Sequence, residues 1–440
     1  MYIRPCLATL VIVLVSLSPL RAGIPARQAE AFPWQHYWQE AVAAYQKKDF
    51  AAFLENSKRA AALAPGRHPL LLLNLARAHS LTGDKVEAVK LLEEVLDMGF
   101  GATAITGKDF DPLRDSDAFR KLARKIEAVR APVANSAVAF TIPEKDLIPE
   151  GIAYDPVGGR FYVGSLHKAK IVSLDPDGRS RDFKREREDG LSGVLGMRVD
   201  ARRRILWVNS AVLPELKGFR KEEEGTSALH KYDLRTGRLL RKYVLANKPS
   251  PHLLNDIAIN AAGELFITDS LASVVYRLRD GGDELEEFVR LKPYSYPNGI
   301  TLSDDGRRLF VAHGEGISLI DVSTGKASAL ATAPGISLFG IDGLYYYRNS
   351  LIGVQNFSGD PLRVVRFHLD RGGRRVERAR ILEANNAIFN IPTTGAVAGS
   401  SFYFIANSQL RSFDPQGNIL PPEKLSDIVI LRTKLLEGKR

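Results

Sequence analysis

Two kinds of hydrophobic spacing divide the chain. Between residues 34 and 98 the apolar side chains recur every three or four positions, which is the period of amphipathic helices. From residue 137 onwards, short runs with period-two alternation are separated by glycine- or asparagine-containing turns, which is the pattern of β-strands. The pattern predicts a multidomain α plus all-β protein: a helical array at 34–130, a linker at 131–136 and a β domain at 137–432.

The helical stretch repeats internally. Joints at 47–49 and 82–84 each connect the two helices of one predicted pair, and Asp49 and Asp84 stand 35 residues apart. This spacing is close to the 34-residue period of helix–turn–helix arrays, and the stretch resembles two degenerate tetratricopeptide (TPR) repeats. The segment from Asp109 to about Val129 resembles the terminal cap of such arrays. Repeat arrays present a concave groove, so the helices are expected either to bind a protein partner or to brace the next domain.

The β domain contains six units of about 45 residues, a length typical of four-stranded propeller blades. Their first strands begin near Glu150, Leu195, Asn255, Asn298, Asp342 and Thr394. The repeat therefore predicts a six-bladed β-propeller. We expect 137–142, rather than 427–431, to supply the strand that closes the ring, and 410–414 to be the third strand of the last blade.

An oxygen-bearing residue opens four of these units, in Glu150-Gly-Ile-Ala, Asn255-Asp-Ile-Ala, Asn298-Gly-Ile-Thr and Asp342-Gly-Leu-Tyr. Because the innermost strands line a propeller's channel, these side chains are expected to converge at one height around the axis. Two carboxylates in a closed channel repel each other, and each is costly to bury without a partner. A divalent cation would resolve both costs, and an all-oxygen ligand set suits Ca²⁺, Mg²⁺ or Mn²⁺.

The longer stretches around these residues resemble the site motifs of the SMP-30/gluconolactonase propellers and of the related paraoxonase and strictosidine-synthase-like propellers. They are Pro149-Glu-Gly-Ile-Ala-Tyr-Asp, Leu254-Asn-Asp-Ile-Ala-Ile, Pro297-Asn-Gly-Ile-Thr and Ile341-Asp-Gly-Leu, and the resemblance covers about 145–432. It implies that Glu150, Asn298 and Asp342 ligate one divalent metal, with Asn255 as a fourth ligand or a substrate contact. Ca²⁺ is the first expectation, with Mg²⁺, Mn²⁺ or Zn²⁺ as alternatives. The resemblance also implies lactone hydrolysis, with Asp342 as the general base acting on water.

The chain departs from the gluconolactonase pattern at positions that would meet the substrate. Leu253 stands where that pattern tends to place an arginine, and the second unit offers Leu195 to the channel. A more apolar lactone or ester than a sugar lactone is therefore expected. The residues predicted to contact it are Asn255, Leu195, Leu253, Thr394, His252 and His313, with the Leu195 and Thr394 sides of the site more open. The polar insertion at 214–226 is expected to be either a lid or an exposed loop.

Residues 1–22 have the pattern of a secretory signal: Arg4, an apolar run over 7–17, and Pro19 before a small-residue cleavage site. Cleavage would remove Cys6, the one cysteine, and lower the net charge from +10 to +8. We expect export to a bacterial periplasm or secretion, with no stable membrane span after cleavage; an uncleaved anchor is the alternative. Residues 433–440 are expected to form a basic tail.

The positive charges are scattered over predicted turns, and no motif of a nucleic-acid-binding fold occurs, so nucleic acid is not an expected partner. The leading hypothesis is an exported, metal-dependent lactone or ester hydrolase. A non-catalytic, metal-stabilised sensor or scaffold that recruits a protein through the TPR-like repeats is the alternative. A lyase or isomerase on the same metal platform is a third hypothesis, because fold does not fix function.

Overall fold

A computed structural model of the protein describes residues 33–436, except positions 65, 293, 295, 357–360 and 415. The described chain divides after Arg130 into two compact units. The predicted signal at 1–22, including Cys6, and residues 437–440 of the predicted tail lie outside the described residues. No helix in the part of the chain that the structure describes is long and apolar enough to cross a membrane.

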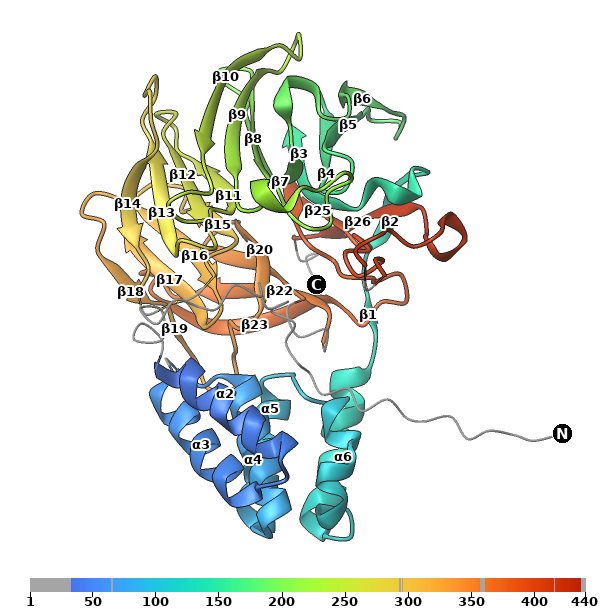
Figure 1. Ribbon diagram of the computed structural model, residues 1–440, viewed down its shortest axis with the longest axis vertical. Coiled ribbons are helices and arrows are strands. Elements are labelled where there is room, and N and C mark those ends of the chain that lie inside the picture. Colours follow the sequence, from blue (N-terminus) through green and yellow to red (C-terminus); the bar gives the residue numbers. More distant parts are fainter. Residues whose placement is uncertain are drawn as a thin grey trace, which may run out of the picture. The chain divides into compact units, whose positions relative to one another are not determined.

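The first unit consists of paired helices, as predicted (Figure 1). Its elements are α2 (Pro33–Gln46), α3 (Phe50–Leu63), α4 (Pro69–Thr82), α5 (Lys85–Asp97), η1 (Ala104–Thr106), η2 (Lys108–Leu113) and α6 (Asp117–Arg130). Both predicted joints carry an aspartate N-cap: Asp49 accepts a hydrogen bond from the Ala52 amide, and Asp84 from the Glu87 amide. Such caps satisfy otherwise unpaired amides of the first helical turn, so they fix where α3 and α5 begin.

Asp109 ties the two helix pairs to the segment that precedes α6. Its carboxylate accepts a hydrogen bond from the Tyr45 hydroxyl of α2 at 2.9 Å and pairs with Arg77 Nε of α4 at 2.9 Å. The Ser80 hydroxyl donates to the Asp109 carbonyl at 2.6 Å. One residue therefore joins three parts of the array through bonds that are largely shielded from water.

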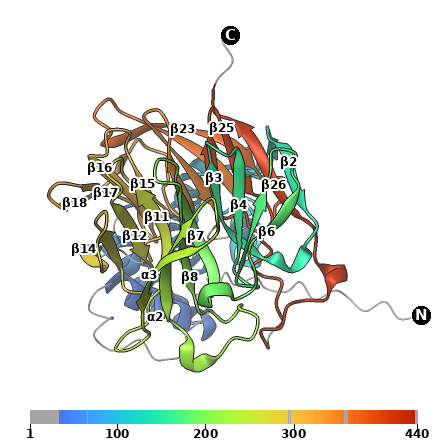
Figure 2. The same ribbon diagram turned by 90° about the horizontal axis from the view of Figure 1, so that it is seen from above.

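The second unit is a six-bladed propeller whose antiparallel sheets follow one another in chain order (Figures 1 and 2). The first blade consists of β3 (Pro149–Asp155), β4 (Arg160–Ser165), β5 (Lys170–Leu174) and β6 (Ser180–Lys184). The second consists of β7 (Gly193–Asp200), β8 (Ile205–Ala211), β9 (Ser227–Asp233) and β10 (Leu239–Leu245). The third consists of β11 (Leu254–Ile259), β12 (Leu265–Asp269), β13 (Val274–Leu278) and β14 (Glu286–Arg290). The fourth blade consists of β15 (Ile300–Leu302), β16 (Arg308–His313), β17 (Gly316–Asp321) and β18 (Ala327–Ala329). The fifth consists of β20 (Ile341–Tyr346), β21 (Ser350–Gln355), β22 (Arg363–Leu369) and β23 (Arg375–Ala384). The fifth blade also carries β1 (Val133–Ala134), from the predicted linker, and β19 (Ala331–Thr332).

The sixth blade closes the ring with strands from both ends of the unit. It holds β24 (Gly395–Ala398), β25 (Ser401–Ile405), β26 (Ile428–Lys434) and, outermost, β2 (Ala137–Ile142). Both views show the early strand β2 beside the late strand β26 (Figures 1 and 2). The predicted closing strand is confirmed. The predicted third strand at 410–414 is wrong: β26 takes that place, because the Ser412 amide turns back to the Gln409 carbonyl and ends any extended run there.

Each interface between neighbouring blades holds one apolar cluster. Representative pairs, one residue from each side, are Tyr162 and Leu206, Trp207 and Ile257, Phe266 and Val311, Phe310 and Leu351, Tyr345 and Phe404, and Ile405 and Ile152. Because burial of these faces is the main favourable term in folding, every blade depends on two neighbours.

Glycine follows the oxygen-donor position in five of the six inner strands, at Gly151, Gly196, Gly299, Gly343 and Gly395. A Cβ on Gly299 would lie 2.3 Å from the Asp342 carbonyl oxygen and 2.5 Å from the Leu344 nitrogen. The Gly299 amide donates to that same carbonyl at 2.9 Å. Backbone therefore packs directly on backbone at this level of the channel, and a side chain has no room there.

The Gly299→Ala variant should be destabilised by about 2–4 kcal/mol, because the rigid backbone of β20 must move to admit the methyl group. Gly372→Ala is the matched control, since its Cβ would meet only the Asp370 side chain, at 3.4 Å. Urea unfolding of both variants measures the difference. Equal stabilities would show that the inner strands are not held in backbone contact.

Candidate metal centre and active site

The predicted donors stand at the start of the inner strands, where four of these strands change register. The pairing shifts between Pro149 and Gly151, between Val194 and Met197, between Leu254 and Ile257, and between Ile341 and Leu344. Each shift is a β-bulge or a similar irregularity of the pairing, which re-aims the side chains within it. The bulges therefore explain how Glu150, Asn255 and Asp342 leave the ordinary alternation of their strands.

Asp342 is held by two amide side chains. Asn298 Nδ2 donates to one carboxylate oxygen at 2.8 Å, and Asn356 Nδ2 donates to the other at 2.6 Å. Asn356 also donates to the Pro392 carbonyl at 2.6 Å. The carboxylate is thus fixed in orientation, and the Asn298 amide turns its oxygen away from Asp342. Asn356 was not predicted, because it follows a second strand outside the repeated motif.

Glu150 is buried, and its Oε2 accepts no hydrogen bond from any described residue. Its backbone is well satisfied, since the Glu150 carbonyl accepts from the Thr393 hydroxyl at 3.2 Å and from the Thr394 hydroxyl at 2.5 Å. An orphaned oxygen on a buried carboxylate is costly without a positive partner.

The Asn255 side chain is oriented from the third blade. Its Nδ2 donates to the Ser270 hydroxyl at 3.0 Å, and Ser270 in turn donates to the Pro297 carbonyl at 2.6 Å. The Asn255 carbonyl accepts from Asn209 Nδ2 at 3.1 Å, and Asn209 Oδ1 is buried without a hydrogen bond from the described residues. Because its nitrogen is engaged, Asn255 offers its oxygen to the channel.

Asp256 is a third buried carboxylate that the repeat did not single out. It occupies the position that is glycine in the other five units, and its Oδ2 is also without a hydrogen bond among described residues. Its other oxygen accepts from the Ile257 amide at 2.8 Å. The signal was present in the sequence, as an acid where the repeat otherwise places glycine.

Burial raises the pKa of all three carboxyl groups, and neighbouring carboxylates add to the rise for Glu150 and Asp342. Burial raises the pKa of Glu150 well above its usual range, and the charges of Asp342 and Asp256 raise it further. Burial raises the pKa of Asp342 to about 7, against the two amide hydrogen bonds, which lower it. Burial also raises the pKa of Asp256, while Arg198 opposes that rise. The shared cause is desolvation of like charges in one place.

These residues fit a divalent cation. Glu150 and Asp256 have orphaned buried oxygens, and Asn255 and Asn298 have amide nitrogens that are already engaged. Among the described residues, no three histidine, cysteine, aspartate or glutamate side chains gather as a metal-binding group. An ion at this end of the channel would therefore need the amide oxygens as well as the carboxylates, which is a donor set suited to a hard cation.

A cluster of buried apolar side chains, here called the apolar cover, lies beside the predicted donors. Leu195 and Leu253 belong to a buried cluster with Leu166 and Ala211, against which Leu213, Leu271, Tyr296 and Leu410 pack. Leu195 is 4% exposed and Thr394 is 5% exposed. The prediction that these two sides of the site are more open is wrong, because the apolar cluster covers Leu195 and the Thr394 hydroxyl bonds to the Glu150 carbonyl.

The two predicted substrate-contact histidines are engaged within their own blades. His252 Nδ1 lies 2.6 Å from a carboxylate oxygen of the fully buried Asp269. In His313, Nδ1 lies 3.2 Å from Glu315 and Nε2 lies 3.1 Å from the Ser318 hydroxyl, and the ring stacks on Tyr294 at 4.2 Å. His313 therefore has both ring nitrogens occupied inside the fourth blade.

The insertion at 214–226 is docked along part of its length. His167 Nδ1 lies 2.6 Å from the Glu215 carbonyl, and the Lys217 amide donates to the His167 carbonyl at 2.8 Å. Leu216 packs with Ala169 and Val212. Burial raises the pKa of the Glu215 carboxyl, and Glu215 is one of the charges that raise the pKa of the Tyr296 hydroxyl, together with Asp342 and Glu150. The insertion thus brings a carboxylate toward the apolar cover.

The two cavities found in the propeller lie at the other ends of the inner strands. They measure about 390 Å³ and about 130 Å³, and both are lined by Arg198, Thr301 and Tyr346. None of the predicted site residues lines either cavity. The buried carboxylates, and not the larger cavities, define the candidate metal centre.

Stability of the metal-free protein should fall as pH rises toward about 7. The Asp342 carboxyl ionises near pH 4 in the unfolded chain and near pH 7 in the folded one. Between these values the unfolded state releases the proton first, so unfolding becomes easier by up to about 4 kcal/mol for this one group. Thermal unfolding from pH 4 to 8 should show the fall, and Asp342→Asn should make it shallower, while Glu150 and Asp256, whose pKa values burial also raises, keep the remainder. A wild-type profile that rises over this range would contradict the buried cluster.

No protein-family model and no curated protein matches this sequence. Among solved structures, the chain is similar to a gluconolactonase from Xanthomonas campestris, with 16% identity, a TM-score of 0.47, and 70% of this chain and 92% of that chain covered. It is also similar to a luciferin-regenerating enzyme, with 14% identity, a TM-score of 0.45, and coverages of 69% and 96%. The PQQ-bound aldose sugar dehydrogenase from Streptomyces coelicolor is similar at 16% identity, with a TM-score of 0.46 and coverages of 69% and 99%. At such identities these likenesses concern the fold alone: the protein is a helical array followed by a six-bladed propeller with gluconolactonase-like and luciferin-regenerating-enzyme-like structural neighbours.

Proposed function

We propose that the propeller is a divalent-metal-dependent hydrolase that opens a lactone or an ester. The observation that carries this proposal is the buried group of carboxylates at one end of the channel, in which oxygens of Glu150 and Asp256 have no hydrogen bond from described residues. Buried carboxylates without a positive partner destabilise the folded state and are typical of functional sites.

Four residues would hold the ion: Glu150 and Asp342 through carboxylate oxygens, and Asn255 and Asn298 through amide oxygens. Ca²⁺ is the cation that this all-oxygen set suits best, with Mg²⁺, Mn²⁺ or Zn²⁺ as alternatives. When bound, such an ion supplies Lewis acidity toward a carbonyl oxygen. Ser270 would keep the Asn255 side chain oriented, since it accepts a hydrogen bond from the side-chain nitrogen, and Asn209 would hold the backbone there through the Asn255 main-chain carbonyl.

Asp342 would act as the general base. Its two amide donors, Asn298 and Asn356, hold the carboxylate in one orientation. Ionised beside the bound ion, this carboxylate would be placed to take a proton from water. The apolar cover formed by the Leu195 and Leu253 cluster would limit bulk water around that proton transfer.

The same cover indicates the substrate class. Leu195, Leu253 and Tyr296 present apolar surface where a sugar ring would need hydrogen-bond partners. A hydroxyl group of a substrate that lay against leucine would lose its hydrogen bonds to water without gaining others. Binding of a sugar lactone would therefore be strongly disfavoured. We therefore propose an alkyl- or aryl-substituted lactone or ester, with Leu195, Leu253 and Thr394 near the bound ring and His252 at the rim.

Export to the periplasm or outside the cell, and recruitment of a protein partner by the TPR-like helices, remain proposals that rest on the sequence pattern. Millimolar free Ca²⁺ outside the cytosol would keep a weak extracellular-type site loaded. Detection of the mature N-terminus by mass spectrometry would test cleavage after residue 22.

The purified full chain should contain about one divalent ion, measured by elemental analysis, and should hydrolyse apolar lactones or esters. Asp342→Asn should lower kcat/KM by about a hundredfold or more while leaving the fold intact, because it removes both a ligand and the base. Asp177→Asn, at a 71% exposed carboxylate, is the charge-matched control and should behave like the wild type.

Full activity of Asp342→Asn would overturn the mechanism. A protein that binds the ion but hydrolyses nothing across a broad panel would instead favour the sensor or scaffold hypothesis.

A further inference from the structure

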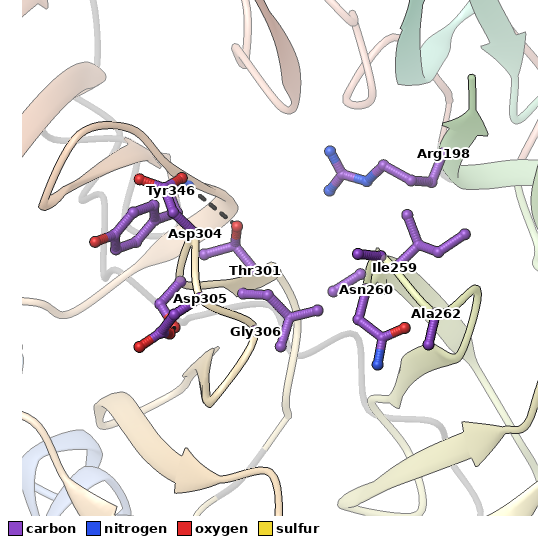
Figure 3. Close-up of a pocket in the computed structure, with 13 residues that line it drawn as sticks. Arg198, Ile259, Asn260, Ala262, Thr301, Asp304, Asp305, Gly306 and Tyr346 are labelled. Carbon is purple, nitrogen blue, oxygen red and sulfur yellow. Dashed lines mark hydrogen bonds between the residues drawn. The ribbon is translucent and has the colours of Figure 1, made fainter. Parts of the chain in front are cut away.

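The cavity of about 390 Å³ lies where the inner strands of the third, fourth and fifth blades end. Its walls include Arg198 from β7, Thr301 from β15 and Tyr346 from β20, and the smaller cavity of about 130 Å³ adjoins it through these same residues. Figure 3 shows the Arg198 guanidinium reaching from one wall toward Thr301, Asp304 and Tyr346 on the other. The cavity is large enough for a small organic molecule.

Arg198 is held in place but has no counter-ion. Its Nε donates to the Ile257 carbonyl at 2.9 Å, and its guanidinium lies 5.7 Å from the Tyr345 ring centre. In the part of the chain that the structure describes, no carboxylate lies within ion-pair distance of it. The partly buried Arg204, by contrast, pairs with Asp155 at 2.6 Å, and Arg203 pairs with Asp200 at 3.2 Å.

The carboxyl group of Asp256 offsets the positive charge of Arg198 only in part. The charge of Arg198 lowers the pKa of Asp256, but the two groups form no ion pair. Asp256 stands at the position that is glycine in the other five units and lines neither cavity. The terminal nitrogens of Arg198 therefore face the cavity as a preoriented fork, the geometry that binds a carboxylate through two parallel hydrogen bonds.

The opposite wall suits a different chemical group. Asp304 is an exposed carboxylate at the lip, and it contributes to raising the pKa of the Tyr346 hydroxyl. Asp305 is committed to the Ser303 hydroxyl and the Arg307 amide. A hydroxyl on the ligand could donate to Asp304, whereas two aspartates at the lip would repel a dianion such as phosphate.

We propose that this cavity is a second binding site of the propeller, and that it takes a small hydroxycarboxylate whose carboxylate is held by Arg198 and whose hydroxyl faces Asp304. The site is separated from the carboxylate cluster by the level at which the inner-strand backbones touch. The proposal does not depend on the hydrolase activity, although ring opening of a lactone yields this class of molecule.

Isothermal titration calorimetry with 4-hydroxybutyrate tests the proposal directly. The full chain is first stripped of metal with a chelator and dialysed, so that the probe cannot bind through an ion. We expect saturable binding of one molecule, with butyrate and 1,4-butanediol each binding at least about tenfold more weakly, because each lacks one of the two recognised groups.

Arg198→Met should weaken 4-hydroxybutyrate at least about tenfold, because it removes the fork but keeps an unbranched apolar stem against Tyr345. Arg235→Met is the control, since Arg235 belongs to the same blade, is 73% exposed and does not line the cavity. Asp304→Asn, at an exposed position that cannot disturb the core, should weaken 4-hydroxybutyrate and leave butyrate unchanged.

Three results would overturn the site. They are the absence of saturable binding in the stripped wild type, equal binding by Arg198→Met or by Asp304→Asn, and tighter binding of inorganic phosphate than of 4-hydroxybutyrate. The Asp342→Asn variant should bind 4-hydroxybutyrate as the wild type does. Failure of this site would thus be distinguishable from failure of the hydrolase proposal.

Discussion

The contact of backbone with backbone around the channel is the constraint on which the rest of the propeller depends. The Gly299 amide bonds to the Asp342 carbonyl at 2.9 Å, and the Gly343 amide lies 3.3 Å from the Thr393 carbonyl. Where the inner-strand backbones touch at the glycines, a side chain has no room. The residue that precedes each glycine is therefore the last one at that end whose side chain can project into the channel. The glycines let the strands approach, and Asn298 and Asp342, one residue before two of these glycines, meet at 2.8 Å.

Asp256 stands where the other five units have glycine, and it adds a third carboxyl group to the candidate site. Asp256 fits because its neighbour in the second blade is Gly196, where a Cβ would lie 2.8 Å from an Asp256 carboxylate oxygen. The two positions are thus mutually dependent: a larger residue at 196 would displace the carboxylate. Crowding of Asp256, Glu150 and Asp342 costs stability in the absence of a cation, which is the usual price of a preorganised functional site.

Much of this arrangement could be predicted from the repeat. The period change near residue 137, the six units and the closing strand at 137–142 follow from alternation and turn residues, because these reflect local sterics and burial. The burial of Glu150 and Asp342 at the start of inner strands also follows from their fixed place in the unit, whereas their role as metal ligands stays a prediction. Asn209 and Asn356 could not be found in this way, since they lie on or after second strands, outside the repeated motif, and meet Asn255 and Asp342 only in the folded chain. The covering of Leu195 by Tyr296 and Leu410 likewise depends on loops from distant blades, which no local pattern encodes.

The pairing of β2 with β26 sets an order for the biogenesis of the protein. The outermost strand of the sixth blade is synthesised before every other blade strand except the two-residue β1, and its partner is synthesised last. Five blades can pair their strands as the chain emerges from the ribosome, but the ring stays open, with β2 as an unpaired edge, until the C-terminal strand is available. A chain that stops short of residue 428 would keep an exposed β-edge at its beginning, so truncation at one end of the propeller would create a site of aggregation at the other.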